Sequence, residues 1–374
     1  MEKPTEERAV DAASLPLRGQ PLHTRTLVID VLREDAQTVR AEGQILDLRK
    51  CAFVPTGGDL QTAGFIHQMK ITTWCHPEER VIQRLETAQP HIAYDPHEST
   101  AGECCRDPAP RLQQLVGTRF DRGFAKRLSQ AFGGPLGCSH LLTLGQLMGH
   151  AIPPGLDRET GIAPGGLAVR QDGERLFKRT LVVDGCADGE DRLEVGVQQA
   201  EFHMRPRIEV SSLLERLAHQ HEVHVHGRVD LGPLVFTAID AAERIRTGET
   251  LFEEAWSERS AEVSSLVGFS ALRGLSGELF RLLGADADRA MLLDALLNVA
   301  PGLIQCLAAT SGRWMARMAE AMRRGSARPV LAEAGGMASG GFPDSCFMWR
   351  SEGPLQKARE AGAGFPGMTR SKAT

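Results

Sequence analysis

The chain has 374 residues, 42% of them hydrophobic, and its 43 basic and 48 acidic side chains give a net charge of −5. This length can supply a core for one large domain or for two of ordinary size. The slightly acidic balance, with one Tyr and four Trp, lacks the basic face and the aromatic platforms of nucleic-acid binders. No apolar run approaches the roughly 18 residues of a membrane span, and the polar first residues lack the apolar stretch of a signal peptide. We therefore expect a cytoplasmic protein with neither a nucleic-acid nor a membrane partner.

The eight cysteines fit reduced thiols in a cytoplasm. No C-x-x-C pair marks a zinc ribbon, and neither a P-loop nor a G-x-G-x-x-G turn marks a phosphate site, so no nucleotide cofactor is expected. The hydrolase motif G-x-S-x-G and the metalloprotease motif H-E-x-x-H are also absent from the sequence. These short motifs leave the function open.

In chain order, residues 1–22 form a polar leader, and a set of strands and then helices follows. Alternating apolar residues predict strands at Thr24–Val31, Thr38–Leu48, Ile66–Trp74 and Arg80–Ala88. A turn at His76–Glu79 joins the last two. Helical spacing predicts helices over Gly117–Phe132 and Ser139–Ile152. Strands followed by helices indicate an antiparallel sheet with helices on one face.

The second half of the chain repeats the first in three places. HTRTLVID from His23 returns as FKRTLVVD from Phe177, and the later matches begin at Phe65 and Leu217 and at Leu115 and Leu266. Because the matches keep their order, we expect tandem copies: repeat 1 over 23–155 and repeat 2 over 176–312. The expected fold class is α+β, with two tandem copies of an antiparallel sheet with helices on one face, packed as a pseudo-twofold pair.

Proline and glycine suggest where the regular elements end. Pro153-Pro154-Gly155 favours a surface linker, which continues over 156–175. In repeat 2 a helix is expected over Asp288–Ala300, with a break or kink at Pro301. Residues 313–374 are expected to be a helix end and a flexible tail rich in Gly, Ala and Ser. The alternative for this tail is an arm folded over a neighbouring subunit or over a site.

Candidate chemistry is concentrated in repeat 1. Cys138 lies at the expected start of a helix, where free N–H groups and the helix dipole favour a thiolate. His140 is close enough in sequence to act as a base or as a second metal ligand. Repeat 2 has Arg289 and Met291 at these two positions, so we expect repeat 2 to be degenerate. The alternative interpretation is that Cys138 is only a small residue that fits a turn and that His140 is a histidine of the core.

Several motifs in 23–152 together resemble the bacterial family called domain of unknown function 2889, the G-C-T-H-L motif family. The residues that carry the resemblance are His23-Thr24-Arg25, Asp47, His67-Gln68-Met69, Cys105 and Gly137-Cys138-Ser139-His140-Leu141. The chain departs from the family pattern at Gln68 and Ser139, and an insertion, His91–Glu103, precedes the cysteine. The resemblance implies a fold and a site, but no reaction.

Two kinds of site can be built from these residues. In the first, a zinc or iron ion is held by His67, Cys105, Cys138 and His140, and Asp47 orients a histidine. Cys104 is an alternative to Cys105 as the thiol ligand in this set. In the second no metal is bound: Cys138 is the nucleophile, His67 or His140 the base, and Asp47 the group that orients the base. Both kinds of site need the same residues near one another, so the sequence leaves both open.

We therefore expect a bacterial enzyme, a lyase or hydrolase for a small-molecule substrate, in which Cys138, His67 and Asp47 are catalytic. One alternative is a non-catalytic binding or scaffold protein with a structural zinc site. Another is a metal-free thiolate enzyme for acyl transfer. A homodimer is expected as well.

Overall fold

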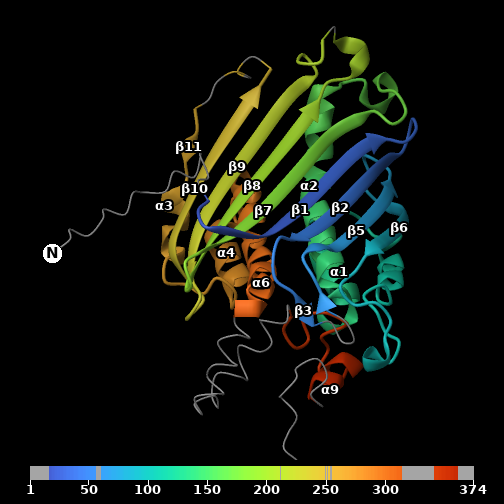
Figure 1. The fold of residues 1–374 in the computed structure, drawn as a ribbon. Coiled ribbons are helices and arrows are strands. Elements are labelled where there is room, and N and C mark those ends of the chain that lie inside the picture. The colour runs from blue at the N-terminus through green and yellow to red at the C-terminus, as the bar shows by residue number, and fades with distance from the viewer. Residues whose placement is uncertain are drawn as a thin grey trace, which may run out of the picture.

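The structure, a computed structural model, describes residues 17–55, 60–210, 212–248, 250, 252, 255–313 and 341–360. Nine strands form one antiparallel sheet in the order β11-β10-β9-β8-β7-β1-β2-β5-β6 (Figure 1). The main helices cover one face of this sheet. The structure thus confirms an α+β fold with a large antiparallel sheet.

The elements follow the chain in two similar series of strands and then helices. The strands are β1 (Gln20–Arg33), β2 (Val39–Arg49), β3 (Val54–Pro55), β4 (Leu60–Gln61), β5 (Gly64–Cys75), β6 (Ile82–His91), β7 (Arg175–Asp188), β8 (Arg192–Met204), β9 (Leu217–Asp230), β10 (Val235–Thr247) and β11 (Ser257–Glu258). The helices are α1 (Phe124–Phe132), α2 (Ser139–Ile162), α3 (Ser260–Val263), α4 (Leu275–Leu283), α5 (Ala290–Leu297), α6 (Val299–Ala309) and α9 (Pro354–Glu360). The four strands expected in the first half correspond to β1, β2, β5 and β6.

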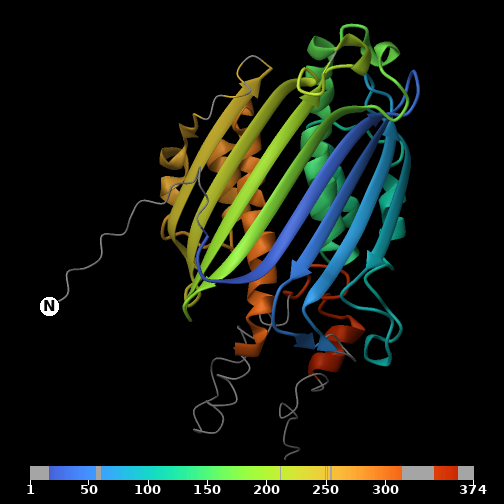
Figure 2. The same cartoon turned by 45° about the horizontal axis from the view of Figure 1, so that its top comes forward.

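The two halves of the chain meet along β1 and β7, which pair at the centre of the sheet (Figure 2). β2, β5 and β6 extend the sheet on one side, and β8 to β11 extend it on the other. Leu27 of β1 lies directly opposite Leu181 of β7. The two expected sheets are therefore joined edge to edge into one.

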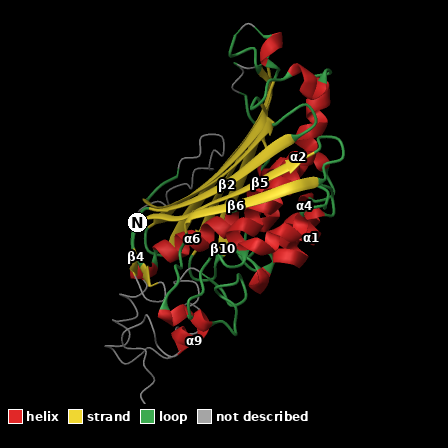
Figure 3. Ribbon diagram, turned by 90° about the vertical axis from the view of Figure 1, so that its right-hand side faces the viewer, coloured by secondary structure: helices red, strands yellow, loops and turns green. Residues whose placement is uncertain are grey.

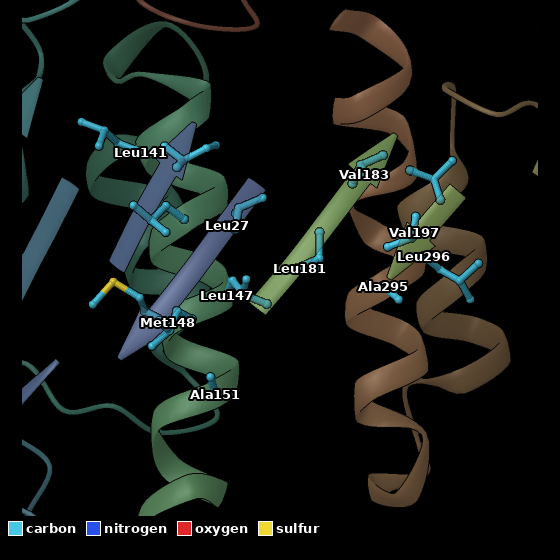
Figure 4. Close-up of a cluster of buried hydrophobic side chains, with 14 of the residues drawn as sticks. Leu27, Leu141, Leu147, Met148, Ala151, Leu181, Val183, Val197, Ala295 and Leu296 are labelled. Carbon is cyan, nitrogen blue, oxygen red and sulfur yellow. The ribbon is translucent and has the colours of Figure 1, made fainter. Parts of the chain in front are cut away.

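The core lies between the sheet and the helices on its inner face (Figure 3). Leu27 and Leu181 from the central strands belong to the same buried cluster as Met148 of α2 (Figure 4). Gly302 of α6 lies so close to Val183 that an added Cβ would be 2.5 Å from that side chain. The helices therefore pack directly on the sheet.

Helix α2 continues beyond the point where the sequence predicts a linker. It runs to Ile162 and includes both Pro153 and Pro154. Each proline removes a backbone hydrogen bond, which costs a helix interior about 3 kcal/mol. Packing offsets this cost, because Leu156 is buried and Gly155 lies against the ring of Phe177. The expected linker at Pro153-Pro154-Gly155 is wrong for this reason.

Two further helix boundaries can be compared with the sequence prediction: the start of α1 and the break between α5 and α6. The helix expected over Gly117–Phe132 begins only at Phe124. Gly117 has a left-handed backbone with φ of 83°, and backbone hydrogen bonds hold Thr118 and Phe120 against the chain at 80–82. The break expected near Pro301 is confirmed: α5 ends at Leu297 and α6 begins at Val299. Pro301 then occupies the first turn of α6, where its missing N–H removes no helical bond.

One helical stretch among the described residues, Ala287–Ala309, is long and apolar enough to cross a membrane. Its most apolar window has a mean hydropathy of 1.6, and 72% of that window is buried inside the fold. The stretch contains α5 and α6, which contact β7, β8 and β9. This stretch therefore lies in the core of the fold, against the sheet.

The end of the chain returns to the first half of the molecule. Residues 341–360, which include α9, pack beside the N-terminal end of α2 (Figure 1). The backbone N–H of Phe347 donates to the carbonyl of Gly137 at 2.7 Å, and Trp349 meets the ring of Tyr94 edge-on at 6.1 Å. Met348, Trp349 and Leu355 are buried. The expectation of a flexible tail is therefore wrong for residues 341–360; the segments on either side, 314–340 and 361–374, lie outside the described residues.

Candidate functional site

Three neighbouring strands place three charged or polar side chains side by side on the inner face of the sheet. Arg25 of β1 pairs across the ladder with Asp47 of β2, and Asp47 pairs with His67 of β5. Directly opposite residues on adjacent strands are in reach of one another. The alternation of each strand turns these residues inward, at the end of the sheet where apolar residues such as Leu27 and Ile45 give way to polar ones.

Asp47 is the centre of this cluster and is fully buried. The guanidinium of Arg25 donates to both of its oxygens, at 2.8 Å from Nε and 3.1 Å from the second nitrogen. Two further nitrogens lie near Oδ2: Nδ1 of His67 at 3.3 Å and Nε2 of His140 at 3.2 Å. Burial alone would raise the pKa of Asp47, but Arg25 and the two imidazoles outweigh it and hold the pKa well below its usual range. Asp47 is therefore an ionised carboxylate.

The two histidines beside Asp47 are stacked on each other. The ring of His140, from the first turn of α2, lies 3.7 Å from the ring of His67, centroid to centroid. Burial lowers the pKa of both imidazoles and brings that of His140 to about 3, although Asp47 opposes the shift. Both rings are therefore neutral at pH 7, and a neutral imidazole can accept a proton.

Cys138 is the residue that caps the N-terminus of α2, as the sequence predicts. Its Sγ lies 3.9 Å from Nδ1 of His140 and 3.8 Å from the sulfur of Met69. Burial raises the pKa of this thiol to about 12, and the N–H groups of Leu141 and His140 only partly offset that effect. The expected resting thiolate is therefore wrong: desolvation outweighs the helix N-terminus, and Cys138 is a neutral thiol.

A cavity of about 150 Å³ opens onto these groups. His67, Cys138 and His140 line one side of it, together with Cys105. Apolar and aromatic residues form most of the remaining wall: Val54, Ile66, Tyr94, Pro301, Ile304, Phe342, Phe347, Met348 and Trp349. The last four belong to the C-terminal segment, so residues 341–349 roof the cavity.

Arg49 adds a positive charge to the wall of this cavity. Its residue is only 3% exposed, and burial lowers the pKa of its guanidinium to about 10, which still leaves it protonated at pH 7. One nitrogen donates to the carbonyl of Gln61 at 3.0 Å, whereas Nε is buried and has no hydrogen-bond partner among the described residues. A buried donor without a partner is costly. Because Arg49 lines the cavity, its guanidinium is the group of the wall that favours a ligand acceptor.

The site residues predicted from the sequence meet only in part. Among the described residues, the group whose possible metal-ligand atoms lie within 4.8 Å of one another is Asp47, His67 and His140, with no cysteine in it. Cys138 adjoins this group, and Cys105 lines the same cavity, where burial raises its pKa well above the usual value. Cys104 is not in the cavity wall and donates to Asp107 at 3.2 Å. The four-ligand set of His67, Cys105, Cys138 and His140 is therefore not assembled.

Sequence reasoning missed several residues of the site. Arg25 belongs to the quoted H-T-R motif, but its pairing with Asp47 needed the strand register. Gln305 of α6, whose amide lies 3.3 Å from Nε2 of His140, carried no signal in the sequence. Cys346, which also lines the cavity, lies in the stretch expected to be a flexible tail.

The second half of the chain keeps a row of charged and polar residues across neighbouring strands, but it lacks counterparts of Cys138 and His140. Arg179, Glu201 and His221 are paired across β7, β8 and β9 in the same way as Arg25, Asp47 and His67. By strand register the counterpart of His67 is thus His221, and not His219 as the sequence match suggests. Arg179 is bonded to Glu201 and Asp294, and His221 to Glu243 at 2.5 Å, so these residues satisfy one another.

Residues 23–152 match a family model described as "Protein of unknown function (DUF2889)". This part of the chain resembles the DUF2889 family. The DUF2889 segment contains Asp47, His67, Cys105, Cys138 and His140, whereas the second half and the roof of the cavity lie outside it. No curated protein and no solved structure matches the chain.

Proposed function

We propose that the protein is a small-molecule enzyme, a hydrolase or acyl transferase, that uses Cys138, His140 and Asp47 as nucleophile, base and orienting acid. The observation that carries this proposal is the position of the His140 ring. One nitrogen lies 3.9 Å from the Cys138 thiol and the other 3.2 Å from the Asp47 carboxylate. This is the connectivity of a nucleophile, a base and an orienting acid, and such contacts are often loose when no substrate is bound.

The protonation states at rest set the proton transfers that this role requires. Cys138 and His140 are both neutral at rest, so the thiol proton passes to Nδ1 of His140 as Sγ bonds to the carbonyl carbon of an ester or thioester. The imidazolium is stabilised by Asp47, which stays ionised. The proton then goes to the leaving alcohol or thiol as its bond to the carbonyl carbon breaks. Water then attacks the acyl carbon and gives a proton to His140. His140 returns the proton to Sγ of Cys138 as the carbon–sulfur bond breaks, and the acid leaves.

The cavity indicates the class of substrate. Its volume of about 150 Å³ suits a small molecule, and its aromatic and aliphatic wall suits an apolar body. The positive guanidinium of Arg49 in the wall suits a carboxylate or another anionic oxygen. We therefore infer a small acyl compound with an anionic group at some distance from its reactive carbonyl.

A metal-dependent lyase or hydrolase is the second candidate. The supporting observation is that the ligand atoms of Asp47, His67 and His140 lie within 4.8 Å of one another, and that Nδ1 of His67 is buried without an aligned hydrogen bond. Two histidines and a carboxylate suit zinc or iron, which would activate a water molecule there. This candidate ranks second because Arg25 already neutralises Asp47 through both oxygens.

The other expectations remain proposals. A scaffold protein with a structural zinc site is less favoured, because neither Cys105 nor Cys138 joins the Asp47 group. A cytoplasmic location, a homodimer, and the lack of nucleic-acid and membrane partners rest on the sequence alone. Tandem duplication gains support from the pairing of Leu27 with Leu181, which the sequence match makes equivalent residues and which would lie on a pseudo-twofold axis.

The test of the leading proposal uses a small activated ester, p-nitrophenyl acetate. The wild type should release about one p-nitrophenol per chain in a burst, and peptide mass spectrometry should find the acetyl group on Cys138. His140→Gln should slow this acylation by roughly 10²–10⁴-fold, because it removes the base. Cys104→Ser is the matched control, since Cys104 is a buried thiol outside the cavity wall, and it should react as the wild type does. Acetylation elsewhere, or none, would sink the proposal.

Elemental analysis separates the two candidates. Roughly one zinc or iron per chain in the wild type, lost in His67→Ala, would favour the metal-dependent reaction. A metal-free wild type that still forms the acyl group on Cys138 is the result expected here.

A further inference from the structure

A second cavity, of about 420 Å³, is lined by residues of α1 and α2 from the first half and of α4, α5 and α6 from the second. Thr143 and Pro301 border both this cavity and the one at Cys138, but its other lining residues are different. The cavity is therefore a separate space beside the proposed active site, at the junction of the two halves.

A histidine and an aspartate from opposite halves meet in its wall. Nδ1 of His150, on α2, lies 2.6 Å from Oδ1 of Asp294, on α5. The other oxygen of Asp294 accepts a hydrogen bond from the buried Arg179 at 2.7 Å. The imidazole is therefore held by Nδ1, and its second nitrogen, Nε2, is the atom left for a ligand. The side chain of His150 is 31% exposed, so a ligand can reach it.

Asn298, between α5 and α6, is a second polar group in the same wall. Its residue is only 4% exposed, and its amide nitrogen donates to the carbonyl of Asp294 at 2.9 Å. Its Oδ1 is buried and has no hydrogen-bond partner among the described residues. A buried acceptor of this kind is costly unless a donor reaches it. Because Asn298 lines the cavity, a ligand N–H or O–H group is a fitting donor for this oxygen.

Charge and apolar surface define the rest of the ligand. Lys126 lines the cavity. Among the described residues that line it, the one acidic side chain is Asp294, which is already bonded to His150 and Arg179. Asp294 outweighs the effect of burial and raises the pKa of His150, which favours a positive imidazole. Phe280 lines the same cavity and is 52% exposed, so it offers an aromatic face to an apolar part of a ligand.

We propose that this cavity is a binding site for a small carboxylate that also carries a hydroxyl or amino group. The carboxylate accepts from Nε2 of His150 beside Lys126, the hydroxyl or amino group donates to Oδ1 of Asn298, and an apolar substituent packs on Phe280. Because its residues come from both halves of the chain, the site exists only when the halves are packed together. Its ligand binds independently of the chemistry at Cys138.

The test is calorimetric titration of the full-length protein with lactate, malate, phenyllactate and phenylalanine. At least one of these should bind, with phenyllactate or phenylalanine tightest if Phe280 contributes. His150→Gln should weaken binding by about tenfold or more, because a hydrogen bond to a charged group is lost. Cys138→Ser is the matched control: it changes the neighbouring cavity and should leave binding of these ligands unchanged.

A second measurement keeps the proposal open to refutation if His150→Gln fails to fold. In the wild-type protein, the NMR signal of His150 Nε2 should shift on addition of the tightest ligand. No binding by any of the four compounds, binding that His150→Gln leaves intact, or binding that Cys138→Ser abolishes would each overturn it.

Discussion

At the scale of single residues, the site depends on one buried charge. Asp47 is fully buried and ionised, a state that is stable only when partners replace the lost water. Arg25 supplies the opposite charge through two hydrogen bonds, and the imidazoles of His23, His67 and His140 each have a nitrogen within 3.4 Å of a carboxylate oxygen. The same residue thus stabilises the fold and orients the proposed base.

Asp47→Asn tests this double role. The amide keeps the shape of the side chain but leaves the Arg25 guanidinium buried without a counter-charge, so the free energy of unfolding should fall by about 3–5 kcal/mol. Urea denaturation measures the change. Asp30→Asn is the control, because its partner Arg175 is 41% exposed, and it should cost less than about 1 kcal/mol. Equal losses in the two variants would contradict the assignment of Asp47 as the central charge.

At the scale of elements, α2 links the site to the sheet. Its first turn carries Cys138 and His140, and its later turns pack against the second half of the molecule at Phe177. Two glycines in its last part differ in their surroundings. A Cβ at Gly155 would lie 2.3 Å from the Phe177 ring, whereas a Cβ at Gly161 would meet nothing within 4 Å.

These two glycines give a matched pair of variants. Gly155→Ala should lower the free energy of unfolding by roughly 1–3 kcal/mol, because overpacking exceeds the gain in helix propensity. Gly161→Ala should raise it by up to about 1 kcal/mol, since only the gain in propensity remains. Thermal and urea denaturation measure both. A stabilising Gly155→Ala would mean that α2 does not continue past its prolines onto β7.

The C-terminal segment is the element that covers the cavity. Trp349 is 5% exposed and packs edge-on against Tyr94. Trp349→Ala should loosen this roof and increase the rate at which iodoacetamide labels Cys138, which peptide mass spectrometry can follow. Trp256→Ala is the control, because Trp256 lies near His224 in the second half, and labelling of Cys138 should not change. If both variants label Cys138 at the wild-type rate, residues 341–349 do not restrict access to it.

At the scale of the whole molecule, buried neutral histidines make the fold sensitive to acid. The pKa is about 4 for His23 and about 3 for His140 in the fold, both lowered mainly by burial, against an ordinary value of 6.5. The unfolded chain therefore binds more protons than the folded one between pH 6.5 and about 4. Stability is fully present above pH 6.5 and is lost as the pH falls through this window. His150, whose pKa is raised by Asp294, contributes in the opposite direction.

We expect the free energy of unfolding to fall by a few kcal/mol between pH 7 and pH 4, at up to about 1.4 kcal/mol per pH unit for each buried histidine. Urea denaturation at a series of pH values measures the slope. His23→Leu should make the slope shallower, because it removes one of the histidines whose pKa is lowered by burial. A wild-type stability that does not change over this range would show that these histidines are not held neutral.

The sequence predicts the fold better than it predicts the chemistry. Alternating apolar residues locate β1, β2, β5 and β6 to within a few residues, because one face of each strand is buried. The prolines at 153 and 154 are misleading, since the packing that offsets them comes from Phe177, far away in the chain. The family match covers residues 23–152 and supports the first half alone.

The residues of the candidate site could be predicted from the sequence in part, whereas their charge states could not. Cys138, His140, His67 and Asp47 carry local signals, and the structure brings them to one cavity or to its edge. Whether Cys138 is ionised could not be predicted, because desolvation depends on residues that cover it from elsewhere in the chain. Cys346 and Trp349 of the roof are examples. Charge state and enclosure are tertiary properties, and short motifs do not encode them.

The pairing of β1 with β7, the seam between the two halves, has a consequence for folding during synthesis on the ribosome. Strand β1 is made early, but its partner β7 spans Arg175–Asp188, so one long edge of β1 stays open while the intervening chain leaves the ribosome. An open edge with an apolar face pairs readily with other strands. We expect the first half of another nascent chain, whose β1 has the same open edge, to be one such partner. Neighbouring ribosomes on one messenger would therefore bring together chains that can exchange halves.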